Sequence, residues 1–180
     1  MNIIKIKTGE NAMIIMYVRH ADAKGDKLTN LGEEQCKLMV KQDECFKFSK
    51  IYSSPLNRCI ETSKYLAEKN KIEIEVKEQL SERKILNRDP ETADEKEWFD
   101  NYLNPNFSHT EPEGCKEFLD RTAAVLDEII ERHKSKNENV IISAHSCTIY
   151  AIMAYLNKTS KKEINWYRVS NCAKIYFEID

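Results

Sequence analysis

Glycine and proline are both scarce in this chain, with four of each among 180 residues. Collagen-like and low-complexity chains are rich in these residues, so both classes are excluded. Long apolar runs are also missing, and none approaches the roughly 20 residues that a membrane-spanning helix needs. The N-terminal stretch alternates with lysines and lacks the apolar centre of a signal peptide. We therefore expect a cytoplasmic protein with no membrane partner.

Neither sign of charge is in excess, because 28 basic residues stand against 30 acidic ones and the formal net charge is -2. We expect no nucleic acid partner, although a nearly neutral protein can still have a positive pocket for a small anion. The six cysteines form no C-x-x-C pair and no zinc-ribbon spacing. Such scatter predicts reduced thiols, most of them buried as small apolar side chains.

Segments typical of strands and of helices alternate along the chain. Continuous apolar runs at 13–18 and 140–144 predict strands buried on both faces of a sheet. Further strands are predicted at 50–53, 72–76 and 173–179, and residues 1–12 allow an edge strand. Helices are predicted at 31–45, from Ser54-Pro55 onward, at 114–133 and after His145.

This alternation predicts an α/β fold with three layers, in which a mostly parallel sheet has helices on both faces. Thr29 is a good N-cap for the first helix, and Pro55 suits the first turn of the second. Residues 81–112 are polar and irregular, which predicts a small cap or lid. The length fits one domain, so we expect residues 1–180 to form a single domain that contains this cap.

Polar side chains follow the ends of three predicted strands. Arg19 and His20 come directly after the first buried run, His145 follows the second, and Arg58 comes after the strand at 50–53. In open α/β sheets, ligands bind beyond the carboxyl ends of the strands. We therefore expect these four side chains to lie in one site.

Two histidines and two arginines together suit phosphoryl transfer without a metal ion or other cofactor. Arginine offers a planar, permanently charged fork that matches phosphate oxygens. A neutral imidazole can act as the nucleophile, and a second, protonated imidazole can stabilise charge on the equatorial oxygens. A carboxylic acid must then protonate the leaving oxygen.

Seven short segments resemble, in the right order, the signature segments of the histidine phosphatase superfamily, which includes the phosphoglycerate mutases. They are Tyr-Val-Arg-His-Ala-Asp at 17–22, Leu-Thr-Asn-Leu-Gly-Glu-Glu-Gln at 28–35, Ile-Tyr-Ser-Ser-Pro-Leu-Asn-Arg-Cys-Ile-Glu-Thr at 51–62, Leu-Ser-Glu at 80–82, Glu-Gly at 113–114, Ile-Ile-Ser-Ala-His at 141–145 and Ser-Asn-Cys at 170–172. The resemblance covers roughly residues 13 to 179, and this order makes it specific although each segment is short.

The resemblance implies a role for each matching residue. His20 would be the nucleophile, Glu82 the proton donor and His145 the second catalytic histidine. Arg19 and Arg58 would complete the phosphate pocket with His145, and Thr29 would lie near it. The chain departs from the family pattern at Ala21 and Ser146, where glycine is frequent, at Asp22-Ala23, where Glu-Thr is common, and at Ile85-Leu86, where the usual glycine after the acid is missing. These departures bear on substrate contacts and leave the catalytic set intact.

The resemblance therefore implies a metal-independent phosphatase that acts on a small phosphorylated substrate through a phosphohistidine. Phosphatase is favoured over a mutase of the phosphoglycerate mutase type because the mutases usually carry a longer insertion. A non-catalytic phosphate-binding module is a further alternative, which the presence of Glu82 disfavours. The substrate and the oligomeric state stay open.

Two rival chemistries have weaker support. His20-x-Asp22 and His145-x-Cys147 could be metal ligands, but neither spacing is typical of a metal hydrolase and the arginines would repel a cation. Cys115 and Arg121 have the spacing of a Cys phosphatase, but the residues between them are helical in pattern and lack glycine. The aromatic residues of 81–112 could line a substrate lid or simply form the core of a small cap.

Overall fold

The computed structural model describes residues 3–4, 12–42, 45–84, 113–157 and 169–179. It contains a six-stranded sheet in the order β1-β8-β2-β7-β5-β6. The strands are β1 (Ile3–Ile4), β2 (Met13–Arg19), β5 (Phe48–Ser53), β6 (Ile74–Val76), β7 (Asn139–Ala144) and β8 (Lys174–Ile179). Every neighbouring pair is parallel except β2 and β8. The sheet is therefore mostly parallel, as predicted.

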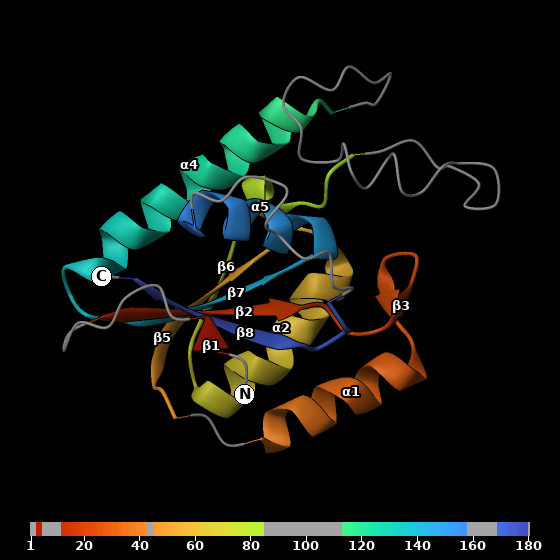
Figure 1. Ribbon diagram of the computed structural model, residues 1–180. Helices are drawn as coiled ribbons and strands as arrows, with labels where there is room; N and C mark the ends of the chain where they lie inside the picture. Colours follow the sequence, from red (N-terminus) through yellow and green to blue (C-terminus); the bar gives the residue numbers. More distant parts are fainter. Residues whose placement is uncertain (1–2, 5–11, 43–44, 85–112, 158–168, 180) are drawn as a thin grey trace.

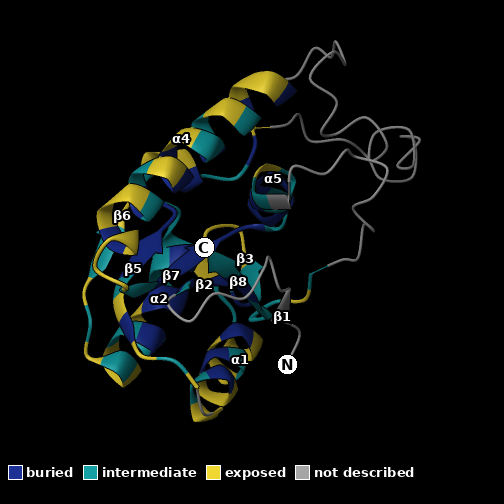
Figure 2. Cartoon of the chain, turned by 60° about the vertical axis from the view of Figure 1, so that its left-hand side comes forward, coloured by how far each residue is buried: buried dark blue, intermediate teal, exposed yellow. Residues whose placement is uncertain are grey.

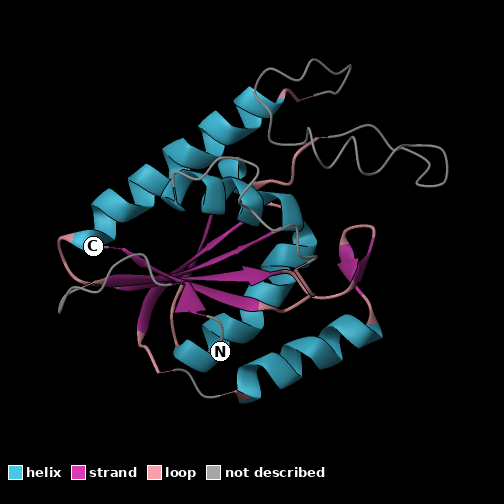
Figure 3. Cartoon of the chain, viewed as in Figure 1, coloured by secondary structure: helices cyan, strands magenta, loops and turns pink. Residues whose placement is uncertain are grey.

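Helices cover both faces of this sheet (Figures 1 and 3), which confirms the three-layer α/β prediction. Helices α1 (Asn30–Lys41) and α2 (Asn57–Asn70) lie on one face. Helices α4 (Cys115–Lys134) and α5 (Ser146–Asn157) pack together on the other. Figure 2 shows that α4 turns a buried side toward the sheet and an exposed side outward, as its amphipathic pattern requires. No helix among the described residues is both long and apolar enough to span a bilayer.

Strand β2 shows why the apolar run at its position forms a central strand. All residues from Met13 to Val18 are buried. Met13, Ile15 and Tyr17 belong to the core cluster under α4 and α5, whereas the alternate residues belong to the cluster on the α1 and α2 side. Successive side chains of a strand point to opposite faces, so one uninterrupted apolar run supplies two cores.

Several element boundaries differ from the sequence predictions by up to four residues, and strand β5 begins at Phe48, two residues earlier than predicted. Helix α1 ends at Lys41, short of the predicted residue 45. Strand β6 has only three residues and begins at Ile74, two residues later than predicted. Helix α2 begins at Asn57 and not at Ser54-Pro55, because the backbone N–H of Ser54 still bonds the carbonyl of Ser143 and continues the sheet ladder. The possible edge strand near the N-terminus is present as β1.

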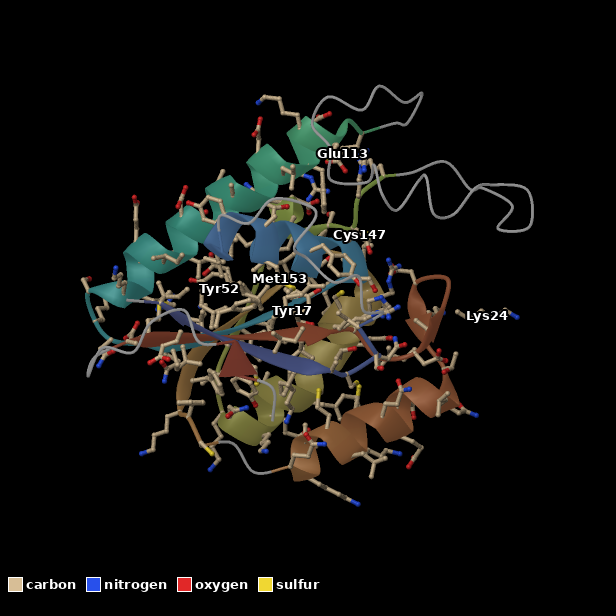
Figure 4. All side chains as sticks on the ribbon, viewed as in Figure 1. Tyr17, Lys24, Tyr52, Glu113, Cys147 and Met153 are labelled. Atoms are coloured by element: carbon tan, nitrogen blue, oxygen red, sulfur yellow. The ribbon has the colours of Figure 1, made fainter. Side chains whose placement is uncertain are left out.

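A small hairpin between β2 and α1 was not predicted. It consists of β3 (Ala23–Lys24) and β4 (Lys27–Leu28), and its turn contains Gly25 at a φ of 63°. Lys24 points away from the body of the molecule in Figure 4. The hairpin turn brings Asp26 to the start of α2, where its carboxylate accepts the backbone N–H groups of Asn57 (3.0 Å) and Arg58 (3.4 Å). A long-range side chain therefore caps a helix that has no cap of its own.

Most of the predicted cap, 81–112, lies outside the described residues, including its aromatic side chains and His109. Of this segment the structure describes 81–84, which follow the short 3-10 helix η1 (Glu78–Leu80). Leu80 is fully buried and fixes the end of η1 in the core under α4.

Candidate active site

Three adjacent parallel strands, β2, β7 and β5, end at the same edge of the sheet. Hydrogen bonds of the ladder continue one residue past the strands, from His20 N–H to the Ala144 carbonyl (3.0 Å) and from Ser54 N–H to the Ser143 carbonyl (2.9 Å). The rings of His20 and His145 consequently lie side by side, with their centroids 5.2 Å apart and their planes at 61°. The structure thus brings together the two histidines that follow buried strands.

The His20 ring is held so that one nitrogen, Nε2, is unprotonated and faces Arg58. Its Nδ1 lies 2.7 Å from the carbonyl oxygen of Ala21, which can only accept, so Nδ1 carries the proton. Its Nε2 lies 3.3 Å from Nε of Arg58, which can only donate. The side chain of Asn171 donates to the His20 carbonyl (2.9 Å) and fixes the backbone from the other side. Both contacts of the ring assign the same tautomer.

His145 is fully buried and has a partner for each ring nitrogen. Its Nδ1 lies 3.4 Å from Nη2 of Arg58, so Nδ1 is the acceptor, and Nε2–H donates to the hydroxyl of Ser54 (2.7 Å). The Cys59 thiol lies against the ring, 3.5 Å from Nε2, and the Tyr17 hydroxyl donates to the His145 carbonyl. This packing leaves the ring one orientation, with Nδ1 toward Arg58.

Burial favours the neutral form of both imidazoles. Burial lowers the pKa of His20 to about 4, and the nearby charges of Arg58 and Arg19 act in the same direction, although the Ala21 carbonyl opposes them. Burial lowers the pKa of His145 to about 2, with His20 and Arg58 contributing. The protonated second imidazole expected from the sequence is therefore disfavoured, because burial and the nearby charges lower the pKa of His145.

Arg58 joins the two histidines through one edge of its guanidinium and is anchored through the other. Nε and Nη2 face the histidines, while Nη1 contacts the Asp26 carboxylate (3.3 Å) and the Gly25 carbonyl (3.4 Å) of the hairpin. Neither Glu34 nor Glu61 pairs with it, since Glu34 binds Lys37 and Glu61 accepts the Leu28 N–H. Arg58 is thus oriented by Asp26 toward the histidines and is no free surface residue.

Arg19 is the last residue of β2, and its charge helps to lower the pKa of both His20 and His145. Its Nη1 donates to the carbonyl of Val169. Its Nε is buried and has no hydrogen-bond partner among the described residues. Since a buried N–H without a partner is costly, a bound oxygen would satisfy it.

Glu82 follows η1 and reaches the first turn of α5. Its carboxylate accepts the backbone N–H of Arg83 (3.0 Å) and of Cys147 (3.4 Å). Figure 4 labels Cys147 at the start of α5, next to the strand end that carries His145. Burial raises the pKa of Glu82, although the N–H donors and the charge of Arg58 oppose the rise. A carboxyl with a raised pKa is suited to proton donation near neutral pH.

Thr29 lies between the loop that follows His20 and helix α1. As N-cap of α1, its hydroxyl accepts the Gly32 N–H (3.1 Å) and donates to the Asp22 carboxylate (2.6 Å). The Asp22 N–H in turn donates to the side chain of Gln35 (2.7 Å). Thr29 and Asp22 therefore hold the loop on α1, and both polar functions of the Thr29 hydroxyl are engaged within the protein.

Sequence reasoning missed several residues that shape this site. Ser54 and Asn171 lie within the motifs quoted above, so a closer look at those motifs could have found them. Tyr17 and Cys59 also lie within these segments, but both resemble ordinary core residues, so the sequence does not mark them as contacts of His145. Asp26 was hidden because its role depends on the unpredicted hairpin.

The structure bears on the two rival chemistries, a metal hydrolase and a Cys phosphatase. No group of three or more His, Cys, Asp or Glu side chains suited to a metal ion exists in the described part of the chain. Cys115 opens helix α4, so the residues between it and Arg121 are helical and form no anion-cradling loop. The six cysteines are all free thiols.

Known proteins share this architecture. The family model of the histidine phosphatase superfamily (branch 1) matches residues 8–180. Among solved structures, Bacillus stearothermophilus YhfR is similar with a TM-score of 0.75 at 20% identity, covering 94% of this chain and 92% of its own. The alpha-ribazole phosphatase from Shigella flexneri has a TM-score of 0.73 at 16% identity, with 91% and 89% of the two chains covered.

A phosphoserine phosphatase from Entamoeba histolytica, crystallised as a mutant in complex with phosphoserine, has a TM-score of 0.74 at 16% identity, with coverages of 91% and 89%. A curated relative, the 2,3-bisphosphoglycerate-dependent phosphoglycerate mutase of Staphylococcus haemolyticus, is 29% identical over 68 residues. These residues are 38% of this chain and 30% of the mutase, so the match spans less than a third of the mutase's length.

Proposed function

Since this chain belongs to the histidine phosphatase superfamily, we propose that it hydrolyses a small phosphate monoester through a phosphohistidine formed on His20. The observation that carries the proposal is the arrangement around Arg58. One guanidinium lies 3.3 Å from Nε2 of His20 and 3.4 Å from Nδ1 of His145, and both nitrogens are unprotonated. A phosphoryl group placed there meets a fixed positive charge and a nucleophile at once.

The substrate dianion would bind where three positive or potentially positive groups converge. Arg58 offers the N–H groups of Nε and Nη2, which face the histidines, and Arg19 offers its buried Nε–H. The dianion also raises the proton affinity of His145, whose Nδ1 can then donate to a phosphoryl oxygen. Positive charge from arginines and a recruited proton would stabilise the transition state without a metal.

The first step transfers the phosphoryl group to His20. The Nε2 lone pair attacks phosphorus, the bond from phosphorus to the ester oxygen breaks, and Glu82 gives its proton to the departing alkoxide. The resulting phosphoimidazolium keeps its proton on Nδ1, which donates a hydrogen bond to the Ala21 carbonyl 2.7 Å away, and this bond stabilises its positive charge. The alcohol product leaves, and Glu82 remains as a carboxylate.

The second step regenerates the enzyme. Glu82 takes a proton from a water molecule, the water oxygen attacks phosphorus, and the bond to Nε2 breaks. Inorganic phosphate leaves, and both His20 and Glu82 return to their starting states. A phosphomutase would instead return the phosphoryl group to a second hydroxyl, and the partial match to a phosphoglycerate mutase keeps this alternative.

The proposed substrate class draws support from proteins of similar fold. Related structures include phosphatases for alpha-ribazole phosphate and phosphoserine, and one has been crystallised with 3-phosphoglyceric acid. We propose a small phosphorylated metabolite of this size as substrate. The six free thiols suit a reducing compartment, which supports the cytoplasm as its location.

A trapping experiment tests the covalent step. Purified protein is mixed with labelled phosphate esters, quenched in acid or in base, and examined for bound label. We expect an adduct that survives base and is lost in acid, as phosphohistidine is. His20→Ala should abolish the adduct and turnover, whereas His133→Ala is the control because His133 is buried elsewhere, on Tyr52 and Glu138. An adduct that persists in His20→Ala rejects the assignment.

A further inference from the structure

The segment that carries Glu82 has little secondary structure of its own. It follows the single turn of η1, and residues 81–84 belong to no helix or strand. Carbonyl groups of such a segment have no partners in a ladder and must be satisfied in another way. A proton donor needs to be held within a fraction of an ångström, so something outside the segment must hold it.

Arg121, on the first third of α4, supplies these bonds. Its Nη1 donates to the carbonyl of Gln79 (2.5 Å) and to that of Ser81 (3.0 Å), and its Nη2 reaches the carbonyl of Glu82 (3.4 Å). The guanidinium packs over the Phe118 ring, 4.8 Å from its centroid. One rigid fork therefore holds one carbonyl of η1 and two carbonyls of the following segment at fixed separations.

Glu113 completes the arrangement from the start of α4, where Figure 4 labels it. Its buried carboxylate accepts from Nε and Nη2 of Arg121, and the same carboxylate accepts the backbone N–H of Lys84 (3.0 Å). The Glu113 carbonyl accepts from the guanidinium of Arg83, with both contacts at 3.3 Å. The residues directly before and after Glu82 are thus fixed on both sides.

We propose that Arg121 and Glu113 are positioning residues for the proton donor, which hold the Glu82 backbone so that its carboxyl meets the start of α5. This inference rests on the proposed function, because it takes Glu82 as the acid. In the proposed function Arg58 and Arg19 would bind the phosphate, whereas Arg121 uses its N–H groups on carbonyls and on Glu113. The pair therefore acts on leaving-group protonation and leaves phosphate binding unchanged.

The test compares two substrates that differ in their need for a proton. Phenyl phosphate has a poor leaving group that must be protonated, whereas p-nitrophenyl phosphate has one that leaves readily. Arg121→Lys keeps a positive charge beside Glu113 but cannot bridge three carbonyls. We expect the ratio of kcat on phenyl phosphate to kcat on p-nitrophenyl phosphate to fall about tenfold, a part of the general-acid effect of about 10²–10⁴. KM for both substrates should stay within about twofold.

Three further variants make the result decisive. Arg132→Lys is the matched control, because Arg132 lies on the same helix and pairs with Glu75 and Glu128 away from the site. Glu113→Gln should also lower the ratio of the two kcat values, and it replaces Arg121→Lys in the test if that variant does not fold. Combined with Glu82→Gln, Arg121→Lys should cause no further fall in the ratio, since both changes remove the same proton transfer.

Two outcomes overturn the inference, and they are distinguishable. If Glu82→Gln lowers the ratio while folded Arg121→Lys and Glu113→Gln leave it unchanged, the pair is merely structural and Glu82 keeps its role. If Glu82→Gln itself leaves the ratio unchanged, Glu82 is not the acid, and this part of the proposed function falls together with the inference.

Discussion

The buried, neutral His145 predicts that this protein loses stability as the pH falls below the ordinary pKa of histidine. In the folded protein the pKa is lowered from 6.5 to about 2, so between these values the unfolded chain binds a proton that the folded chain excludes. The free energy of unfolding therefore falls with falling pH, by about 1.4 kcal/mol for each unit. From about pH 7.5 to 4.5 this amounts to about 2.7 kcal/mol, a large share of a typical domain stability of about 5–15 kcal/mol.

Two other groups of the site modify this slope in known directions. His20, with its pKa lowered to about 4, adds a contribution of the same sign, reduced because its ring is partly exposed. Glu82 acts oppositely: its pKa is raised in the folded state, so the folded protein takes up that proton first and gains stability as the pH falls. Replacing Glu82 by Gln should therefore make the loss of stability in acid steeper.

The measurement is urea unfolding, followed by circular dichroism, at several pH values in buffers free of phosphate. Phosphate must be absent because an anion that binds only the folded site would stabilise it. His145→Asn removes the titrating ring, so its stability should depend on pH less steeply than that of the unaltered protein, by about 1.4 kcal/mol per unit below pH 6.5. Comparing slopes cancels any constant loss from altered packing. Parallel lines for the two proteins would refute the argument that His145 is kept neutral by burial.

Other consequences can be tested independently. Arg58→Ala should lower kcat/KM roughly tenfold to a hundredfold, since a charge-assisted contact contributes about 1.5–3 kcal/mol, and inhibition by vanadate should weaken in parallel. Turnover should survive prolonged EDTA treatment, and a loss that added zinc restores would favour a metal hydrolase. Asp22→Asn should affect phenyl phosphate hydrolysis much less than Glu82→Gln, because Asp22 serves the loop through Thr29. Gly32→Ala should destabilise the fold by about 1–3 kcal/mol, because its Cβ would lie 2.1 Å from the Asp22 carbonyl oxygen, whereas Gly114→Ala, with nothing within 4 Å, should cost less than about 1 kcal/mol in urea unfolding.

The buried strands and their ends could be predicted from sequence because each apolar run changes directly to polar residues. The run that stops at Val18 and continues as Arg19-His20 shows both that a strand is buried and where it ends. Parallel strands then bring their carboxyl ends to one edge by geometry alone. For this reason the grouping of Arg19, His20, Arg58 and His145 needed no knowledge of side-chain contacts.

The hairpin could not be predicted from periodicity, because its strands have only two residues each. Gly25-Asp26 is a recognisable turn pair, yet the flanking residues are too few to show alternation. The cap of α2 was missed for the same reason, since the carboxylate that accepts the Asn57 N–H comes from this turn. The residues around Ser54-Pro55 give no sign that a carboxylate from another part of the chain caps this helix.

The contacts that position Glu82 could not be predicted from sequence either, for a different reason. Arg121 and Glu113 meet residues 79–84 across a long stretch of chain, and a pairing at such separation leaves no periodic signal. Sequence spacing instead suggested a comparison of Arg121 with Cys115, which the structure places in one helix. Long-range polar contacts of this kind become visible only when the backbone is in place.

The backbone hydrogen bonds between β2 and β7 also set the relative positions of the two histidines. Arg19 lies opposite Ala144, and the His20 N–H bonds the Ala144 carbonyl, so the register places the backbones of His20 and His145 on adjacent strand ends, which are about 4.8 Å apart, and the ring centroids lie at 5.2 Å. A slip of one residue in this register would turn one imidazole to the opposite face, so intermediate separations are not accessible. Loops around the site can therefore be exchanged, in evolution or by grafting, to change the substrate while the distance between the two rings is inherited unchanged.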